Sequence, residues 1–227
     1  MPLLALDTSA AISVAVLDDT GTVLGERFHD DTRQHAELLA PLIDSLLAEV
    51  GIVPAELNAI AVGTGPGPFT GLRIGLVTAE TLAFALSIPV YGVCSLDALA
   101  AQAVSELDLP AGGEVIVTLD ARRKEVYWAR YQVTTEGLVP SISPQVTAPT
   151  VVSENRASSE TGSPVIVGDG ALKYQVPGAA APRFAQAQWV GKLAQRRAAS
   201  GIEQPTTPLY LRRPDIQGAP PELLPQR

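Results

Sequence analysis

Hydrophobic residues at the start of the chain gather in three short runs separated by turn residues. The runs cover 3–6, 12–17 and 22–28, and each has the length of a strand. The first run ends at Asp7, and a turn rich in Asp, Thr and Gly joins the second to the third. Three sequential strands with tight links predict an antiparallel meander.

A different spacing begins after the third run. Apolar residues recur every three or four positions from 34 to 50, which predicts an amphipathic helix that stops before Gly51. Pro41 lies inside this stretch, so it either kinks the helix or occupies the first turn of a shorter one. The next predicted elements are a strand, a helix, a strand and a helix, at 58–62, 72–86, 90–93 and 95–107.

The pattern restarts after a Pro- and Gly-rich linker at 110–113. A strand at 114–120 ends in Leu-Asp, as the first run does, and a turn leads to a second strand at 125–131. This repetition predicts a duplicated α/β fold, with one subdomain at 1–109 and a smaller one at 110–227.

The second copy has weaker periodicity than the first. Residues 133–163 are rich in Thr, Ser and Pro, and we expect loops, a third strand and one short helix there. A strand at 165–167 leads into Gly168-Asp169-Gly170, and a helix follows at 188–199. The last ~10 residues are rich in Pro and predict a frayed tail.

The segment Gly63–Arg73 joins a buried strand to the helix at 72–86 through a glycine- and proline-rich loop. Strand, glycine loop and helix is an arrangement that presents backbone N–H groups to an anion. The loop is not a Walker P-loop, because no Lys-Ser/Thr follows its last glycine, and it lacks the Rossmann spacing. We expect Thr70 to cap the helix with its hydroxyl.

The helix at 72–86 is apolar nearly all round, and Arg73 and Glu80 share one narrow strip with Val77 and Phe84 beside it. Small residues recur at every fourth position on another side and form a flat ridge: Gly71, Gly75, Ala79 and Ala83. Periodicity leaves two interpretations open. The helix is fully internal, or a second helix approaches it along this ridge.

Composition and charge narrow the class of protein. The chain of 227 residues is long enough for two modest domains, and no apolar run approaches the ~20 residues that cross a bilayer. The start of the chain resembles a strand and not a signal peptide. One cysteine, Cys94, fits a reducing cytoplasm. A formal charge of −8 argues against a protein that grips nucleic acid by itself.

The element order, given twice, resembles the actin, Hsp70 and sugar-kinase superfamily, in which each half has a ribonuclease-H-like core. Within this class, four segments strongly resemble the bacterial TsaB (YeaZ) family and span nearly the whole chain. They are Leu4–Ser9, Gly65–Arg73, Asp120–Arg122 with Glu125–Ala129, and Tyr210–Arg212. That resemblance implies a cytoplasmic dimerization subunit of the machinery that makes threonylcarbamoyladenosine at position 37 of tRNA.

The resemblance also implies partners and their cofactors. We expect a homodimer when the chain is alone, and a complex with a metal-binding catalytic paralogue (TsaD-like) and a P-loop ATPase (TsaE-like). ATP, Mg²⁺ and threonylcarbamoyl-AMP would be handled by the complex, tRNA would be met indirectly, and no membrane is involved. The expected interface combines two helices: His35, Leu39, Ile43, Gly71, Leu72, Gly75, Leu76, Ala79 and Ala83.

The resemblance further implies that this chain is a pseudoenzyme. The catalytic paralogue holds a metal through a His-x-x-x-His pair after the strand that follows the glycine-loop helix. The corresponding segment here, 89–99, contains no histidine, and His29 and His35 lie six apart elsewhere. We therefore expect neither catalytic nor metal-binding residues, which also disfavours a peptidase.

Two aspartates remain candidates for a functional site. Asp7, with Thr8 and Ser9, and Asp120 correspond to the positions where actin-like kinases hold Mg²⁺ beside nucleotide phosphates, so a small ATP-binding kinase or ATPase is the alternative function. We favour the interpretation that each Asp caps the turn after its strand. Arg122, Arg123 and Lys124 are a basic cluster that could touch RNA in a complex, but we favour an exposed, solvated turn as the explanation.

Overall fold

The computed structural model describes residues 2–30, 35–158 and 163–212. Two mixed sheets of five strands follow one another, in the orders β3-β2-β1-β4-β5 and β10-β9-β6-β7-β8. The first contains β1 (Leu3–Asp7), β2 (Ile12–Leu17), β3 (Val23–His29), β4 (Ala59–Gly63) and β5 (Val90–Val93). The second contains β6 (Glu114–Asp120), β7 (Val126–Thr134), β8 (Gly137–Thr147), β9 (Val165–Val167) and β10 (Ala179–Ala180).

The two sheets have the same topology. In each, the first strand pairs antiparallel with the second and parallel with the fourth, as β1 does with β2 and β4, and β6 with β7 and β9. This repeated order confirms the predicted α/β class with a duplicated ribonuclease-H-like fold. In the second copy the last two strands, β9 and β10, are short, whereas β7 and β8 are the longest strands of the two sheets.

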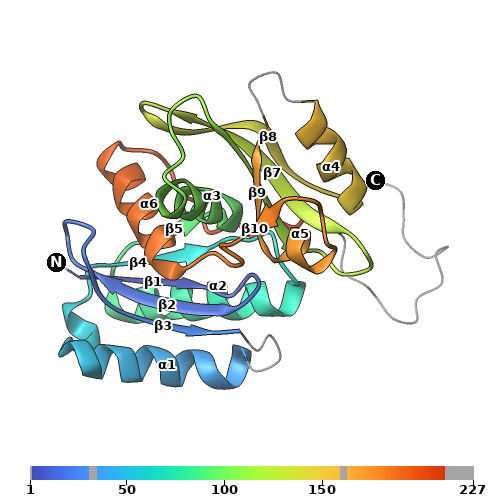
Figure 1. Cartoon of the computed structure of the whole chain (residues 1–227). Coiled ribbons are helices and arrows are strands. Elements are labelled where there is room, and N and C mark those ends of the chain that lie inside the picture. Colours follow the sequence, from blue (N-terminus) through green and yellow to red (C-terminus); the bar gives the residue numbers. More distant parts are fainter. Residues whose placement is uncertain (1, 31–34, 159–162, 213–227) are drawn as a thin grey trace, which may run out of the picture.

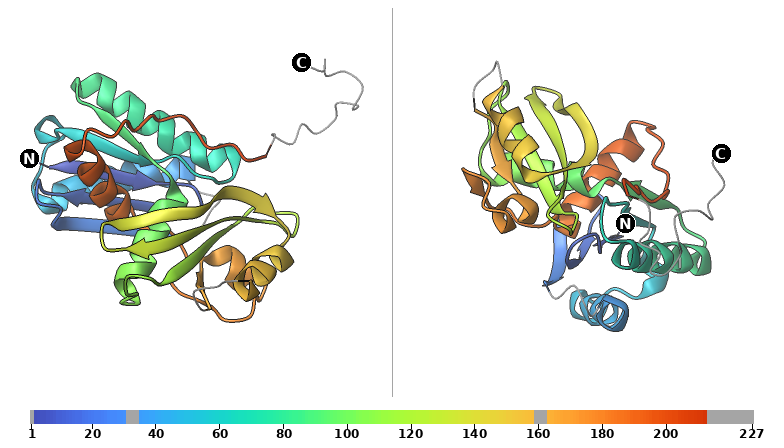
Figure 2. Two further views of the ribbon diagram at one scale, coloured as in Figure 1. Left: turned by 90° about the horizontal axis from the view of Figure 1, so that it is seen from above. Right: turned by 90° about the vertical axis from the view of Figure 1, so that its right-hand side faces the viewer.

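Helices and sheets alternate in layers (Figures 1 and 2). The helices are α1 (His35–Val50), α2 (Phe69–Leu86), α3 (Ser95–Glu106), α4 (Pro149–Ala157), α5 (Asp169–Lys173) and α6 (Ala187–Ala199), with the 3-10 turn η1 (Pro54–Glu56). One cluster joins α1 and α2 to the first sheet, a second joins α3 and α6 to both sheets, and a third joins α4 and α5 to the outer face of the second sheet.

Strand β1 shows why the first sheet is sandwiched. Leu4 and Leu6 point into the cluster under α1 and α2, whereas Leu3 and Ala5 point into the cluster shared with α6. Alternate side chains leave a strand on opposite faces, so a strand that is apolar at every position needs a cover on both sides. The continuous apolar run at the start of the sequence follows from this layering.

Helix α6 comes from the second half of the chain but packs on the first sheet. The Ala187 amide donates to Ser13 Oγ at 2.8 Å, and the Gln195 side chain donates to the Asp18 carbonyl at 2.7 Å. The boundary at residue 110 separates the strands of the two sheets, but this helix crosses back over it.

The chain after α6 forms an extended segment, residues 203–212, which we call the C-terminal strap. The Gly92 amide donates to the Gln204 carbonyl at 3.0 Å, and the Leu209 amide donates to the Thr64 carbonyl at 2.8 Å. The strap therefore runs from β5 past the glycine loop toward the second sheet (Figure 2). The predicted tail after residue 212 lies outside the described residues.

Several local expectations are confirmed or corrected. Pro41 lies inside one continuous helix, and residues 133–163 hold the expected strand (β8) and short helix (α4). Thr70 does not cap α2: the helix begins at Phe69, Pro68 occupies the cap position, and no side-chain cap bond forms. Thr70 instead lies exposed in the first turn, because the helix starts three residues before the predicted position.

The flat ridge on α2 is not a surface of the chain. Gly71, Gly75, Ala79 and Ala83 are all buried, and they face the first sheet inside the core. Leu72 and Leu76 lie in the same cluster, as do Leu39 and Ile43 of α1. The side chain of His35 is outside the described part of the structure. These residues of the expected interface are therefore not on the surface of the isolated chain, since the small residues here serve the contact with the chain's own sheet.

The outward strip of α2 is the one that carries Arg73, Val77, Glu80 and Phe84. Phe84 is 88% exposed and Val77 is 59% exposed. By length and composition α2 is apolar enough to cross a membrane, a test that core helices of globular proteins also pass. Here its apolar character has two separate causes: one face lies in the core, and the other carries exposed apolar side chains.

Candidate functional site

Asp7 is buried at the end of β1, where the chain turns into β2. Its Oδ1 accepts hydrogen bonds from the Ser9 amide (2.8 Å) and the Ser9 hydroxyl (2.5 Å). Its Oδ2 accepts one from the Ser95 hydroxyl at the start of α3 (2.6 Å). Each carboxylate oxygen is thus engaged by protein donors, and Asp7 ties the β1–β2 turn to α3, which is the turn-capping role with an added long-range partner.

Thr8 connects the same turn to α2. Its hydroxyl donates to the Gly71 carbonyl at 2.8 Å and accepts from the Gly75 amide at 3.1 Å. In an α-helix this carbonyl and this amide normally bond to each other. Here the Thr8 hydroxyl bonds to both of them. A Cβ at Gly75 would overlap Thr8 Oγ1, and glycine at this position is what lets β1 and α2 approach.

The glycine loop packs closely on this corner. A Cβ on Gly63 would overlap the Asp7 carboxylate, and one on Gly67 would overlap the Ser9 carbonyl. Two loop N–H groups are used within the protein, since Thr64 donates to the Val93 carbonyl at 2.8 Å and Gly65 donates to Ser95 Oγ at 3.2 Å. The loop is therefore shaped at least partly by contacts with its own chain.

Asp120 ends β6 in the position that corresponds to Asp7 in the second copy. Its Oδ2 accepts from Lys173 Nζ at 2.5 Å, and its Oδ1 accepts from the Tyr174 hydroxyl (2.9 Å) and the Arg122 amide (3.0 Å). Burial alone raises the pKa of Asp120, but the hydrogen bonds from Lys173, Tyr174 and Arg122 together outweigh it and hold the pKa below its usual value. Asp120 is therefore a paired carboxylate that caps its turn.

Asp169 is the first residue of α5 and lies next to Asp120. Its Oδ1 accepts the Asp120 amide at 3.1 Å. Burial raises the pKa of Asp169 to about 6, and the nearby Asp120 carboxylate adds to this effect. The segment Gly168-Asp169-Gly170 had been noted in the sequence, but no pattern there indicated that its carboxyl would lie against Asp120.

A cavity of about 320 Å³ lies between the glycine loop, the β6–β7 turn and the C-terminal strap. Its lining includes Arg122 and Arg212, and Tyr210 of the strap packs on Phe69 with ring centroids 5.1 Å apart. Arg212 donates to the Ala121 carbonyl at 3.1 Å and pairs with Glu125. The strap thus joins the two halves of the chain across this cleft.

The β6–β7 turn has a strained backbone. Arg122, Arg123 and Lys124 have φ angles of 62°, 51° and 61°, the left-handed region that side chains with a Cβ disfavour. All three residues are exposed. The basic cluster predicted from the sequence is therefore real and projects from the surface beside the cleft.

The segment after β5 contains polar and small residues in place of a metal-binding pair. Cys94 has a thiol whose pKa is raised far above its usual value by burial, and Ser95 is engaged with Asp7. Across the described ranges, no group of three or more His, Cys, Asp or Glu side chains is arranged to hold a metal ion.

Two five-stranded sheets of one topology, each with an aspartate at the end of its first strand, define an α/β protein of the duplicated ribonuclease-H-like class. The sequence model of a family described as "TsaD: tRNA N6-adenosine threonylcarbamoyltransferase" matches residues 22–190. The chain is also similar to the crystal structure "YeaZ from Pseudomonas aeruginosa", with a TM-score of 0.74 and 32% identity over 92% of this chain and 99% of that one.

Relatives in sequence agree with this assignment. An uncharacterised protein of Mycobacterium tuberculosis is 40% identical over 219 residues, which is 95% of this chain and 93% of that protein. The tRNA threonylcarbamoyladenosine biosynthesis protein TsaB of Escherichia coli is 34% identical over 171 residues, 75% of this chain and 72% of that protein. The chain belongs to the TsaB (YeaZ) family.

Proposed function

We propose that this chain is the non-catalytic dimerization subunit of a cytoplasmic complex that transfers a threonylcarbamoyl group to N6 of adenosine 37 of tRNA. The support from sequence is that relatives named TsaB are described as tRNA threonylcarbamoyladenosine biosynthesis proteins. In the proposed complex a TsaD-like paralogue supplies the metal and the catalysis, and a TsaE-like P-loop ATPase handles ATP. Mg²⁺ and threonylcarbamoyl-AMP belong to the complex and not to this chain.

The observation that carries a scaffold role is the outward strip of α2. Phe84 and Val77 expose large apolar surfaces on a regular helix, with Arg73 and Glu80 on the same strip. An aromatic side chain that is 88% exposed has an apolar surface that a partner would remove from water. The proposed surface replaces the ridge of small residues, which the core already uses. The same strip would serve the homodimer and the complex with the paralogue.

The donor sets around the two aspartates weigh against the kinase or ATPase alternative. A Mg²⁺ ion prefers free carboxylate oxygens, whereas both oxygens of Asp120 receive protein N–H or O–H donors, one of them the Lys173 ammonium. An ion at this place would have to displace that ammonium. Asp7 is engaged in the same way by Ser9 and Ser95.

A reconstitution tests the proposed function. The chain together with the enzyme that makes threonylcarbamoyl-AMP should yield no modified adenosine from tRNA, ATP, threonine and bicarbonate, with or without Zn²⁺ or Fe²⁺. Further addition of the paralogue and the ATPase should produce it. Modified adenosine from the chain alone would overturn the non-catalytic assignment. Full activity of the partners without this chain would overturn its role in the complex.

The partner surface has its own test. Phe84→Glu should prevent the homodimer and the complex with the paralogue in size-exclusion chromatography with light scattering, because the carboxylate would be buried without a partner. The matched control is Val139→Glu, an exposed apolar residue of β8 in the second half, which should associate normally. An intact complex with Phe84→Glu would place the interface elsewhere.

The basic turn supports a second, smaller proposal, that Arg122, Arg123 and Lys124 contact tRNA within the complex. A strained, exposed turn that carries three cations fits a contact with phosphates. Replacing Arg123 and Lys124 by Gln should weaken tRNA binding by the assembled complex and reduce its salt dependence. Unchanged salt dependence would show that the turn is only solvated.

A further inference from the structure

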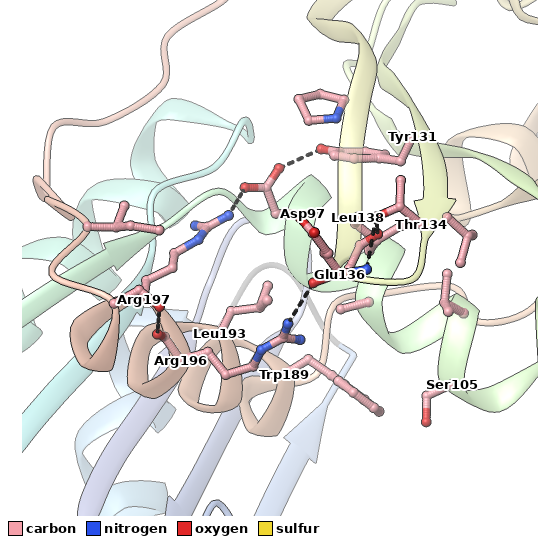
Figure 3. A pocket seen from close by; sticks show the side chains of 17 residues that line it. Asp97, Ser105, Tyr131, Thr134, Glu136, Leu138, Trp189, Leu193, Arg196 and Arg197 are labelled. Atoms are coloured by element: carbon pink, nitrogen blue, oxygen red, sulfur yellow. Dashed lines mark hydrogen bonds and ion pairs between the residues drawn. The ribbon is translucent and has the colours of Figure 1, made fainter. Parts of the chain in front are cut away.

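A larger cavity, about 590 Å³, lies between α3, α6 and the β7–β8 hairpin (Figure 3). Strand β7 separates it from the cleft described above, since Tyr127 near the start of the strand lines the cleft, whereas Tyr131 and Val133 near its end line this cavity. The volume falls within the range typical of small-ligand sites. The two cavities are therefore distinct, and nothing in the proposed function uses this one.

One end of the cavity is a satisfied polar cluster. Asp97 accepts a hydrogen bond from the Tyr131 hydroxyl at 2.6 Å and pairs with Arg197 at 2.6 Å. These contacts join α3, β7 and α6, as the dashed lines in Figure 3 show. Both oxygens of Asp97 accept hydrogen bonds, and Arg197 balances its charge. This cluster therefore lines the cavity but has no unpaired charge to offer a ligand.

Arg196 is different from its neighbour. Its guanidinium makes one long hydrogen bond, 3.5 Å, to the Glu136 carbonyl, and among the described residues no acidic side chain forms an ion pair with it. It lies exposed beside Trp189 and Leu193 on the same side of α6 (Figure 3). A planar guanidinium with free N–H groups at a cavity is a match for a carboxylate, which it can bind through two parallel hydrogen bonds.

The rest of the lining is mostly apolar. The apolar side chains that line the cavity from α3, α6, the hairpin and the segment after α6 are Ala101, Val104, Val133, Leu138, Pro140, Leu193 and Ile202, with the indole of Trp189. Lys192 covers the Trp189 ring at 4.4 Å, donates to the Gln188 side chain at 3.0 Å and is not part of the lining of this cavity. The Trp189 N–H is buried and has no acceptor among the described residues.

We propose that this cavity binds a small carboxylic acid with an apolar body, whose carboxylate pairs with Arg196 and whose chain lies against Ala101, Val104 and Leu193. A single unpaired guanidinium balances one negative charge. A dianionic phosphate would leave one charge unbalanced close to Asp97 and the exposed Glu136 on the same lining. The apolar wall supplies burial that a fully polar anion could not use.

Octanoate is the probe, with octanamide as its uncharged counterpart and octyl phosphate as the dianion. Calorimetry on the full-length chain should show octanoate binding with a dissociation constant roughly in the sub-millimolar range expected for ten heavy atoms. Octanamide and octyl phosphate should bind at least about tenfold more weakly. Octanoate should also change the tryptophan fluorescence, and Trp189→Phe should abolish that change, because Trp128 is buried in another cluster.

Variants locate the site. Arg196→Gln should weaken octanoate binding about tenfold or more, and Ala101→Leu should weaken it by filling the cavity. Arg183→Gln, at an exposed arginine outside the lining of this cavity, is the matched control and should leave octanoate binding unchanged. Circular dichroism confirms folding of each variant. Equal binding of octanamide, no binding of octanoate at millimolar concentration, or unaltered binding by Arg196→Gln would each overturn the proposal, whatever the outcome for the tRNA complex.

Discussion

Replacing Gly75 by Ala is the sharpest test of how α2 meets β1. In an exposed helix this change stabilises by about 1 kcal/mol, because alanine loses less backbone entropy than glycine. Here the new Cβ would overlap Thr8 Oγ1, a buried hydroxyl bonded to Gly71 and Gly75, and would lie 3.3 Å from Leu6. We expect Gly75→Ala to be destabilising overall.

The magnitude follows from the two ways to relieve the overlap. Turning the hydroxyl away breaks two hydrogen bonds inside the core, at roughly 1–3 kcal/mol for the group left unsatisfied. Moving α2 away from β1 costs roughly 1–3 kcal/mol, as overpacking does elsewhere. Either cost exceeds or offsets the gain in helix propensity, so the free energy of unfolding should fall by about 1–2 kcal/mol.

Urea unfolding followed by circular dichroism measures the effect. Removing the hydroxyl first makes room, so Gly75→Ala in a Thr8→Ala background should be neutral or stabilising, with a coupling of about 1–3 kcal/mol between the two sites. Ala85→Gly, an exposed position of the same helix, gives the propensity term alone. Stabilisation by Gly75→Ala in the parent, with additive effects in the double variant, would refute the bridging role of Thr8.

The order of the strands and helices was predictable because a strand buried on both faces is apolar at nearly every position of the sequence. Strands β1, β2, β4 and β6 are sandwiched between helical layers, so they read as short continuous apolar runs. Leu-Asp at the ends of β1 and β6 marked the duplication correctly. Local signals of this kind depend only on neighbours along the chain.

The orientation of α2 was not predictable by the same means. A helical wheel groups Gly71, Gly75, Ala79 and Ala83 on one side, but small residues permit close approach of any backbone, whether from another chain or from the chain's own sheet. The face of α2 that meets the sheet is marked by hydrogen bonds that link Gly71 and Gly75 to the hydroxyl of Thr8, which lies more than sixty positions earlier. Periodicity cannot report a contact of that sequence separation.

The partners of the two aspartates were missed for a similar reason. Asp7 was expected to cap its own turn, which it does through Ser9, but Ser95 had no visible link to it. Lys173 ends a five-residue helix, which is too short to give a periodic signal, and Tyr174 follows it directly. Pairing of this kind arises when the second sheet forms and brings β9 and α5 beside β6.

Three further measurements bear on the cleft and its neighbours. Arg212→Ala removes the donor to the Ala121 carbonyl and the partner of Glu125, so amide exchange at Leu209 in the strap should accelerate; unchanged exchange would show that Arg212 does not hold the strap. Phe84→Glu should change the free energy of unfolding of the monomer by less than about 0.5 kcal/mol, because a side chain 88% exposed has little to lose in the folded state, and a larger loss in urea would mean that Phe84 is packed. Asp169 gives a pH dependence whose sign is fixed. Its pKa rises from 3.8 when unfolded to about 6 when folded, so the folded chain binds the extra proton between these values and stability falls as pH rises through this window. The contribution lost by pH 7 is about 3 kcal/mol, and Asp169→Asn, which keeps the acceptor for the Asp120 amide without the charge, should recover most of it. Urea titrations of both proteins from pH 3.5 to 7 measure the difference, and a difference that stays constant across that range would show that the carboxyl of Asp169 titrates as it does in water.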